Sequence, residues 1–146
     1  MPLILEASSE YSPDEYERLF QNILVKMIQH QDRGIRIIVM EKASVMKAKL
    51  DSKTLNEKVF PAFLSGFTDP HPALREATLR TCIFLSDKLS ETSINQELIK
   101  YLGRLQGDEQ PGIRTNTIIA IGKLTKNLTE SASEQVVIHL IHYIRF

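Results

Sequence analysis

The chain has one cysteine, no tryptophan, six glycines and six prolines among its 146 residues. A single cysteine cannot form an internal disulfide, which is typical of an intracellular protein rather than of a small secreted scaffold. So few glycines and prolines predict few turns and long elements. The small aromatic fraction of 7% disfavours a sandwich built from many hairpins.

An excess of charge of either sign is also missing, since 18 basic residues balance 18 acidic ones. Bulk positive charge therefore cannot hold a nucleic acid to this chain. No apolar run approaches the roughly 20 residues of a membrane-spanning helix, so no membrane insertion is expected. The first ten residues lack the basic start of a secretory signal. A hydrophobic fraction of 42% excludes intrinsic disorder and suits a folded domain.

What the sequence does contain is an internal repeat. The tripeptides Gly-Ile-Arg, Ala-Leu-Arg and Gly-Ile-Arg end at Arg36, Arg75 and Arg114, which are 39 residues apart. Agreement over many columns without gaps indicates structural units of one length. Further columns at this offset are Met46, Leu85, Leu124; Leu50, Leu89, Leu128; Phe20, Val59, Leu98, Val137; and Leu24, Phe63, Leu102, Ile141.

The start of each unit has the pattern of an amphipathic helix. Ser12 and Glu15 form a capping box around Pro13, which stands at the first helical position. The same signature predicts that later first helices begin at Thr54 with Glu57, Ser93 with Gln96 and Ser131 with Glu134. Apolar residues then recur at helical spacing in the first unit: Tyr16, Leu19, Phe20, Ile23, Leu24, Met27 and Ile28.

A second helix follows a short polar turn in each unit, over 34–50, 73–89 and 112–128. Pro61 falls inside the first helix of the second unit, where we expect it to kink the helix. Each second helix carries an apolar stripe: Ile35, Ile38, Ala43, Met46, Leu50; Leu74, Ala77, Cys82, Leu85, Leu89; and Ile113, Ile121, Leu124, Leu128.

These patterns predict an all-α fold, an α-solenoid of HEAT- or armadillo-type helical hairpins with about three and a half repeats. We expect an N-terminal extension over 1–11, units over about 12–50, 51–89 and 90–128, and a partial unit over 129–146. The partial unit lacks a second helix to cover its apolar face. We therefore expect a piece of a longer solenoid, or self-association through this half-repeat. That face comprises Val137, Leu140, Ile141 and Ile144.

The sequence shows no catalytic constellation, because it has neither a glycine-rich phosphate loop nor an HExxH motif. We predict no catalytic residue, no cofactor and no metal site. His139 and His142 have the spacing of two metal ligands, but without further partners we interpret them as ordinary surface or interface histidines. Cys82 shares a column with Ala43 and Ile121, which favours a buried packing role over a reactive thiol.

The repeated arginines allow two interpretations. Asp69 precedes Arg75 by six residues, and Asp108 precedes Arg114 by the same number. This recurrence favours a structural ladder of charge-assisted hydrogen bonds over direct binding of a partner. The predicted ladder comprises Arg36, Asp69, Arg75, Asp108 and Arg114, and His30 stands where the first unit would have its aspartate.

The best candidate for a binding surface is a set of basic residues on the second helices. Second helices usually line the concave face of a solenoid, where such arrays bind their partners. The residues are either solvated lysines or a weak positive stripe for an acidic peptide or a nucleic acid. The candidates are Lys42, Lys49, Arg80, Lys88 and Lys123.

Several segments together resemble the HEAT region of the Scy-like, or N-terminal kinase-like, pseudokinases. The resemblance runs from about Leu19 to about Leu128 and is more specific than that of a generic HEAT repeat. Its motifs are DRGIR at 32–36, VFP at 59–61, GFTD at 66–69, LRE at 74–76, TL at 78–79, LS at 89–90, LQ at 105–106, IRTNT at 113–117 and IGK at 121–123.

This resemblance implies a non-catalytic cytoplasmic scaffold that lies beside an inactive kinase-like domain in the family's full-length members. Family members act as adaptors, either in Golgi-to-ER trafficking with COPI coats or in tRNA export from the nucleus. The implied partners are coat or trafficking proteins, or alternatively tRNA, and the trafficking branch implies association with the Golgi. The family has no catalytic residues to transfer to this sequence.

Overall fold

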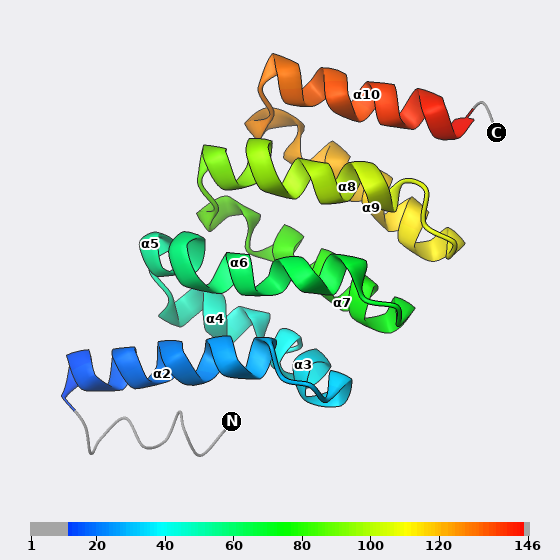
Figure 1. Cartoon of the computed structure of the whole chain (residues 1–146). Helices are drawn as coiled ribbons and strands as arrows, with labels where there is room; N and C mark the ends of the chain where they lie inside the picture. The colour runs from blue at the N-terminus through cyan, green and yellow to red at the C-terminus, as the bar shows by residue number, and fades with distance from the viewer. Residues whose placement is uncertain (1–11, 145–146) are drawn as a thin grey trace.

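The computed structural model describes residues 12–144, in which every regular element is a helix and no strand occurs. The extension predicted over 1–11 lies outside the described residues, as do the last two residues. The helices stack as successive antiparallel pairs along one axis (Figure 1). The predicted all-α solenoid is confirmed.

One layer of the stack contains the first helix of each unit, and we call it the first-helix layer. Its members lie side by side at the front of Figure 1. They are α2 (Pro13–Ile28); a continuous run of α5 (Ser52–Thr54), η2 (Leu55–Val59), α6 (Phe60–Phe63) and η3 (Leu64–Thr68); then η5 (Ser93–Leu98) with α8 (Ile99–Leu105); and α10 (Glu130–Ile144).

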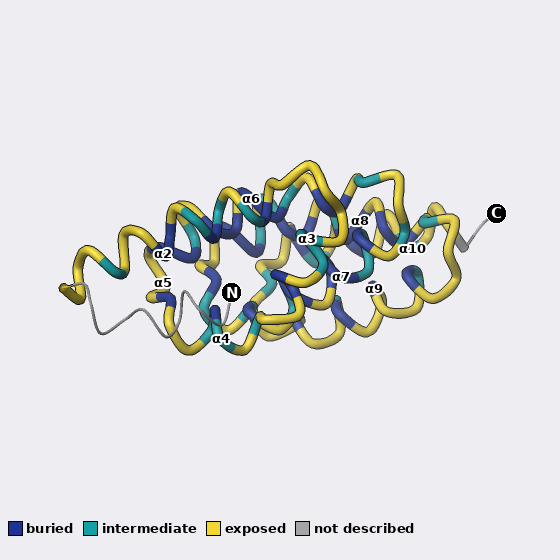
Figure 2. Tube along the Cα trace, turned by 90° about the horizontal axis from the view of Figure 1, so that it is seen from below, coloured by how far each residue is buried: buried dark blue, intermediate teal, exposed yellow. Residues whose placement is uncertain are grey.

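The second-helix layer lies behind it. Figure 2 shows that buried residues concentrate between the two layers, while the outer surfaces of both are exposed. This is the arrangement expected when each helix buries one apolar stripe. The layer consists of α3 (Arg33–Met40) with α4 (Ala43–Lys49), α7 (Pro72–Phe84) with η4 (Ser86–Lys88), and α9 (Pro111–Leu124) with η6 (Thr125–Asn127).

The first helices begin at positions 39 residues apart, and not at the local capping patterns that were used to predict three of their starts. The capping box at Ser12 and Glu15 is confirmed. The predicted starts at Thr54, Ser93 and Ser131 are wrong, because the capping side chains belong to Asp51, Ser90 and Thr129. Together with Ser12 these residues are spaced by 39, so the cap belongs to the repeat.

The second helices are shorter than predicted. Instead of one helix over 34–50, α3 ends at Met40 and α4 begins at Ala43. The break leaves the Met40 carbonyl to accept a hydrogen bond from the Thr81 hydroxyl of α7, at 3.4 Å. In the other two units α7 and α9 end at Phe84 and Leu124 and pass into 3-10 turns. The chain then becomes extended before the next helix.

Two residues assigned to apolar stripes are exposed instead. Leu19 is 41% exposed and Ile38 is 54% exposed. Beside Ile38 the buried position is Val39, whose equivalents Thr78 and Thr117 are also fully buried. Each threonine hydroxyl donates to the carbonyl four residues before it, at 2.7 Å. This internal bond lets a polar residue occupy an otherwise apolar column.

Pro61 lies in the first turn of α6, directly after the π-helical segment η2. The third unit has a π-helical segment at the equivalent place, η5, although that helix has no proline. The wider helical turn is therefore a feature of the repeat rather than a consequence of Pro61.

Candidate protein-binding surface

One edge of the array, where each first helix turns into its second helix, carries a chain of ionic hydrogen bonds. Arg75 donates from Nε and Nη2 to the two carboxylate oxygens of Asp108 in the next unit, at 2.7 and 3.0 Å. Its Nη1 donates to the carbonyls of Asp69 and Pro70 in its own turn, at 2.8 and 3.1 Å. One guanidinium thus joins two units with a fork geometry that lysine cannot reproduce.

Arg36 has the equivalent place in the first unit. It donates to the Ile28 carbonyl at 3.0 Å and to Asp69 of the second unit at 3.3 Å. Arg33 was not among the predicted ladder residues, yet it also donates to Asp69, at 3.0 Å. The Asp69 carboxylate therefore accepts hydrogen bonds from two arginines, whereas the Asp108 carboxylate accepts from one.

Both ladder carboxylates are held in the ionised form. Burial would raise the pKa of Asp69 and Asp108, but hydrogen bonds from arginine and from a nearby backbone N–H outweigh burial. The pKa of each carboxyl group is consequently below its ordinary value. The bond to Asp108 raises the pKa of Arg75.

The two ends of the ladder differ from its middle. In the first unit His30 Nδ1 accepts from the Asp32 backbone N–H at 3.0 Å, as the Asp69 carboxylate accepts from His71 at 2.8 Å. A ring nitrogen thus replaces a carboxylate oxygen as the acceptor in this turn. Arg114 donates to the Asp108 carbonyl at 2.6 Å, and no carboxylate within residues 12–144 pairs with it.

The opposite edge holds the units together with asparagine side chains, which the sequence reasoning missed. Asn56 donates to the Lys88 carbonyl at 3.0 Å and accepts from the Ser90 N–H at 2.7 Å. Asn95 lies 39 residues later and bonds Asn127 and Thr129 in the same way, at 2.9 and 2.8 Å. The repeat offset was the available signal for this pair.

The predicted basic stripe divides into two groups. Lys88 uses its ammonium internally, donating to the Lys47 and Leu50 carbonyls at the C-terminal end of α4. The remaining four are exposed and make no ion pair or side-chain hydrogen bond with any residue described: Lys42, Lys49, Arg80 and Lys123.

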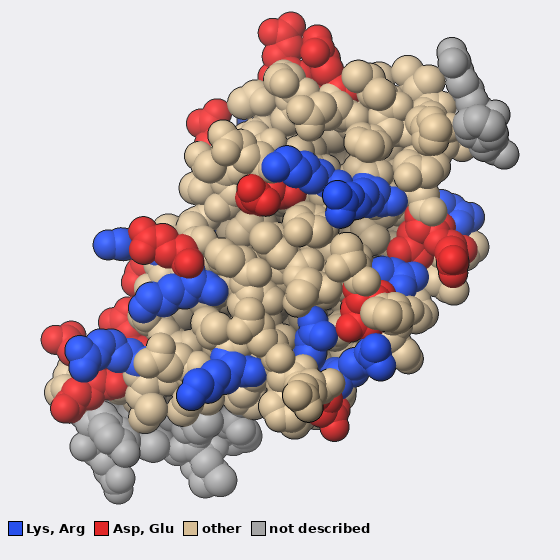
Figure 3. Space-filling view, in the orientation of Figure 1, with Lys and Arg blue, Asp and Glu red and all other residues tan. Residues whose placement is uncertain are grey.

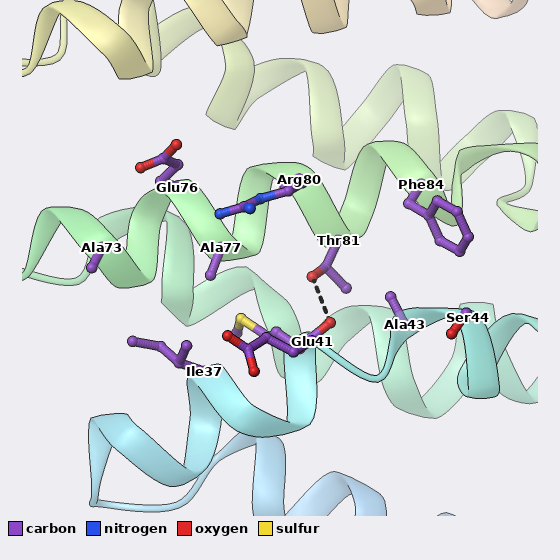
Figure 4. Close-up of a pocket in the computed structure, with 11 residues that line it drawn as sticks. Ile37, Glu41, Ala43, Ser44, Ala73, Glu76, Ala77, Arg80, Thr81 and Phe84 are labelled. Atoms are coloured by element: carbon purple, nitrogen blue, oxygen red, sulfur yellow. Dashed lines mark hydrogen bonds between the residues drawn. The ribbon is translucent and has the colours of Figure 1, made fainter.

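Two grooves cross the second-helix layer. The first, of about 470 Å³, lies between the α3–α4 pair and α7, and Figure 4 shows Arg80 and Glu76 above it and Glu41 below it. The second, of about 560 Å³, lies between α7 and α9 and contains Arg80 and Lys123. Lys42 and Lys49 line neither groove. The structure thus brings together Arg80 and Lys123 but not the whole predicted stripe.

The face of the first-helix layer has a different character. Figure 3 shows Lys and Arg side chains spread over this face, at most a few adjoining one another, and interspersed with Asp and Glu around uncharged surface. On the part of the chain drawn in colour, no continuous basic patch is visible on this face. A groove of about 500 Å³ on this side, between η5–α8 and α10, contains one cation, Lys100, whose ammonium lies 3.9 Å from the Glu97 carboxylate. The exposed cations Arg80 and Lys123, which have no such partner in the described structure, lie beside the grooves of the second-helix layer.

Groups able to support other chemistry are scarce. Cys82 is buried, and burial raises the pKa of its thiol far above the ordinary value, so the thiol is unreactive as predicted. His139 packs against Gly103, where a Cβ would lie 2.8 Å from the ring. Residues 12–144 contain no cluster of three potential metal ligands. None of their helices has the length and apolarity needed to cross a bilayer.

Comparison with known proteins finds several that this chain is similar to, although no protein-family model matches it. It is 33% identical over 135 residues to the "probable inactive serine/threonine-protein kinase scy1" of Dictyostelium discoideum, covering 92% of this chain and 16% of that protein. It is 25% identical over 122 residues to "protein kinase domain-containing protein ppk3" of Schizosaccharomyces pombe, covering 84% and 19%. The crystal structure of Cex1p superposes with a TM-score of 0.73 at 25% identity, covering 90% of this chain and 24% of that one.

These matches confirm the predicted similarity to the Scy-like helical-repeat region. The chain spans less than a quarter of each of the three proteins. The first relative is named an inactive kinase, which agrees with the prediction that this segment is not an enzyme.

Proposed function

We propose that this Scy-like helical-repeat segment is a non-catalytic scaffold that binds protein partners through its second-helix layer. The observation that carries the proposal is the pair of grooves on that layer, bordered by exposed apolar side chains and by cations without internal partners. Phe84 is 46% exposed and Ile119 is 52% exposed, and both line a groove. Exposed apolar groups rimmed by polar residues are typical of protein interaction sites.

The partner we propose is a component of intracellular vesicle trafficking, a coat complex of the COPI type, which would place the protein in the cytoplasm and at the Golgi. The test is surface plasmon resonance of purified COPI coat complex over the immobilised chain. Phe84→Asp should weaken binding by about tenfold or more, as truncating an interface anchor does. Leu19→Asp alters a similarly exposed apolar residue on the other layer and should leave binding unchanged. Absence of coat binding to the wild-type chain would refute this partner.

tRNA is the second candidate partner, favoured by the exposed cations Lys42, Lys49, Arg80 and Lys123. Lys88 is dropped from this set because its ammonium is already hydrogen-bonded. A labelled tRNA titrated at 50 and 200 mM salt should bind with strong salt dependence if this candidate is correct. At each salt concentration, the variant with both Lys42→Glu and Lys49→Glu should then bind tRNA more weakly than the wild-type chain does. Lack of tRNA binding at low salt would refute tRNA as a partner of this segment.

We also propose that the chain self-associates through α10. Val137, Ile138 and Ile141 on this helix are 51%, 65% and 46% exposed, while the side chain of Ile144 lies outside the described part. Sedimentation velocity at about 100 μM, the range of a weak dimer, should show dimer that Val137→Asp with Ile141→Asp abolishes. A strictly monomeric wild-type chain with α10 folded would contradict this.

A further inference from the structure

The two grooves of the second-helix layer belong to one surface. Glu76, Arg80 and Phe84 line both grooves and occur at intervals of four residues on α7. Residues at this spacing share one helix face. They form a ridge, defined here as these three residues, with one groove on each side.

The floors of the grooves suit apolar side chains. Met40 and Ala77 are buried in the first groove, as are Leu79 and Ala120 in the second. Two of the labelled residues that line the first groove carry a hydroxyl: Ser44 is exposed, and the buried Thr81 already donates to the Met40 carbonyl (Figure 4). A leucine-sized side chain can therefore enter each groove without leaving the Thr81 hydroxyl unpaired.

Charge differs between the grooves. The first is bordered by two carboxylates, Glu41 and Glu76, and by the Arg80 guanidinium. The second is bordered by two cations, Arg80 and Lys123, and by Glu76. Although Glu76 and Arg80 are four residues apart on one helix, they form no ion pair in the described structure. These charges remain available to an occupant.

This charge distribution favours a peptide over a nucleic acid. A phosphate backbone is uniformly negative, so Glu41 and Glu76 would repel it at the first groove. A peptide can place a basic side chain beside the first groove and an acidic one beside the second. Packed helices lie about 8–10 Å apart, and side chains three positions apart in a polyproline II segment lie about 9 Å apart on one side.

Deepening the proposed scaffold function, we infer that the two grooves bind a polyproline II peptide with two apolar anchors three positions apart and opposite charges at its ends. One anchor enters each groove on either side of the ridge. The basic end lies near Glu41 and Glu76, and the acidic end lies near Arg80 and Lys123.

The probes are two fluorescein-labelled peptides, Lys-Leu-Pro-Pro-Leu-Asp and Asp-Leu-Pro-Pro-Leu-Lys, which present the charges in both chain directions. Fluorescence anisotropy with the full 146-residue chain should show saturable binding of at least one. The same peptide with serines for leucines should bind about tenfold more weakly, as loss of two buried anchors predicts. Lack of binding by both peptides, or equal binding of the serine peptide, would overturn the inference.

Variants of the chain assign the binding to the ridge. Arg80→Glu with Lys123→Glu, and separately Phe84→Asp, should each weaken peptide binding about tenfold. The matched controls Lys26→Glu and Leu19→Asp alter exposed residues of α2 and should have no effect. Circular dichroism checks that each variant is folded. Unchanged peptide binding in the folded ridge variants, or displacement of the peptide by tRNA, would overturn the assignment.

The same variants separate this inference from the proposed function. Coat complex that binds the wild-type chain and the ridge variants equally would overturn the groove inference and leave the scaffold proposal intact. Peptide binding that needs the ridge, without any coat binding, would refute the coat partner and support the groove inference.

Discussion

The two edges of the array perform the same task with different chemistry. At the right-hand edge of Figure 1, where first helices turn into second helices, arginines hold the aspartate of the next unit; at the left-hand edge, asparagines hold the next turn. Both sets recur at the 39-residue offset. The charged edge depends on the ionisation of a carboxylate, whereas the amide edge does not. Their stabilities should therefore respond differently to substitution and to pH.

The largest effect is expected at the charged edge. Asp108→Ala should lower the free energy of unfolding by about 3 kcal/mol, because it leaves the mostly buried Arg75 guanidinium without its carboxylate. Urea denaturation measures this change. Asp87→Ala removes a carboxylate that is 62% exposed and paired with Lys47, so it should change stability by less than about 0.5 kcal/mol. Equal losses in both variants would mean that burial does not distinguish these pairs.

The amide edge should be weaker by comparison. Asn56→Ala removes the bonds to the Lys88 carbonyl and the Ser90 N–H and should lower the free energy of unfolding by about 2 kcal/mol. Asn56→Asp keeps the acceptor oxygen but loses the N–H donor. Its free energy of unfolding should therefore lie between those of the wild-type chain and Asn56→Ala. A loss larger than that of Asp108→Ala would reverse the ranking of the two edges.

The dependence on pH provides a sharper contrast. Because the pKa values of Asp69 and Asp108 are lowered in the folded chain, their contribution is complete above the unfolded value of about 3.9. It is lost as the pH falls through the lower folded values. Between about pH 4 and about pH 2, wild-type stability should therefore decline more steeply than that of Asp69→Asn with Asp108→Asn. Asn56→Ala should keep the wild-type slope, and a flattened slope in that variant would contradict the assignment.

The sequence predicted the helical units and the arginine and aspartate columns because both follow one period. It misplaced three helix starts because a local Ser/Thr-x-x-Glu/Gln pattern was preferred over the offset from Ser12. Asp51 fits that offset but not the local pattern. In this chain the 39-residue offset therefore predicts the helix starts better than the local capping pattern does.

The candidate surface was less accessible to prediction. Lys88 and Lys123 look alike in sequence, but only Lys88 is placed where it donates to the carbonyls of α4. The grooves depend on the separation of neighbouring second helices, which no single helix encodes. Glu41 and Glu76 consequently lie beside a groove only through the packing of α3, α7 and α9 against one another, which the sequence patterns do not specify.

A last comparison concerns one core column at the charged edge, which holds Ile28, Phe67 and Gln106 in successive units. All three are buried, but neither amide atom of Gln106 has a hydrogen-bond partner within residues 12–144. Gln106→Leu should raise the free energy of unfolding by about 1 kcal/mol, because it removes an unsatisfied buried amide.

Gln21→Leu is the matched control for this substitution. Gln21 is equally buried, but it donates to Thr54 at 3.2 Å and accepts from Lys58 at 2.8 Å. Its replacement should lower stability by about 1 kcal/mol, opposite in sign to Gln106→Leu. Thermal and urea denaturation of both variants measure the two changes. If Gln106→Leu also loses stability, then the Gln106 amide has a hydrogen-bond partner in solution.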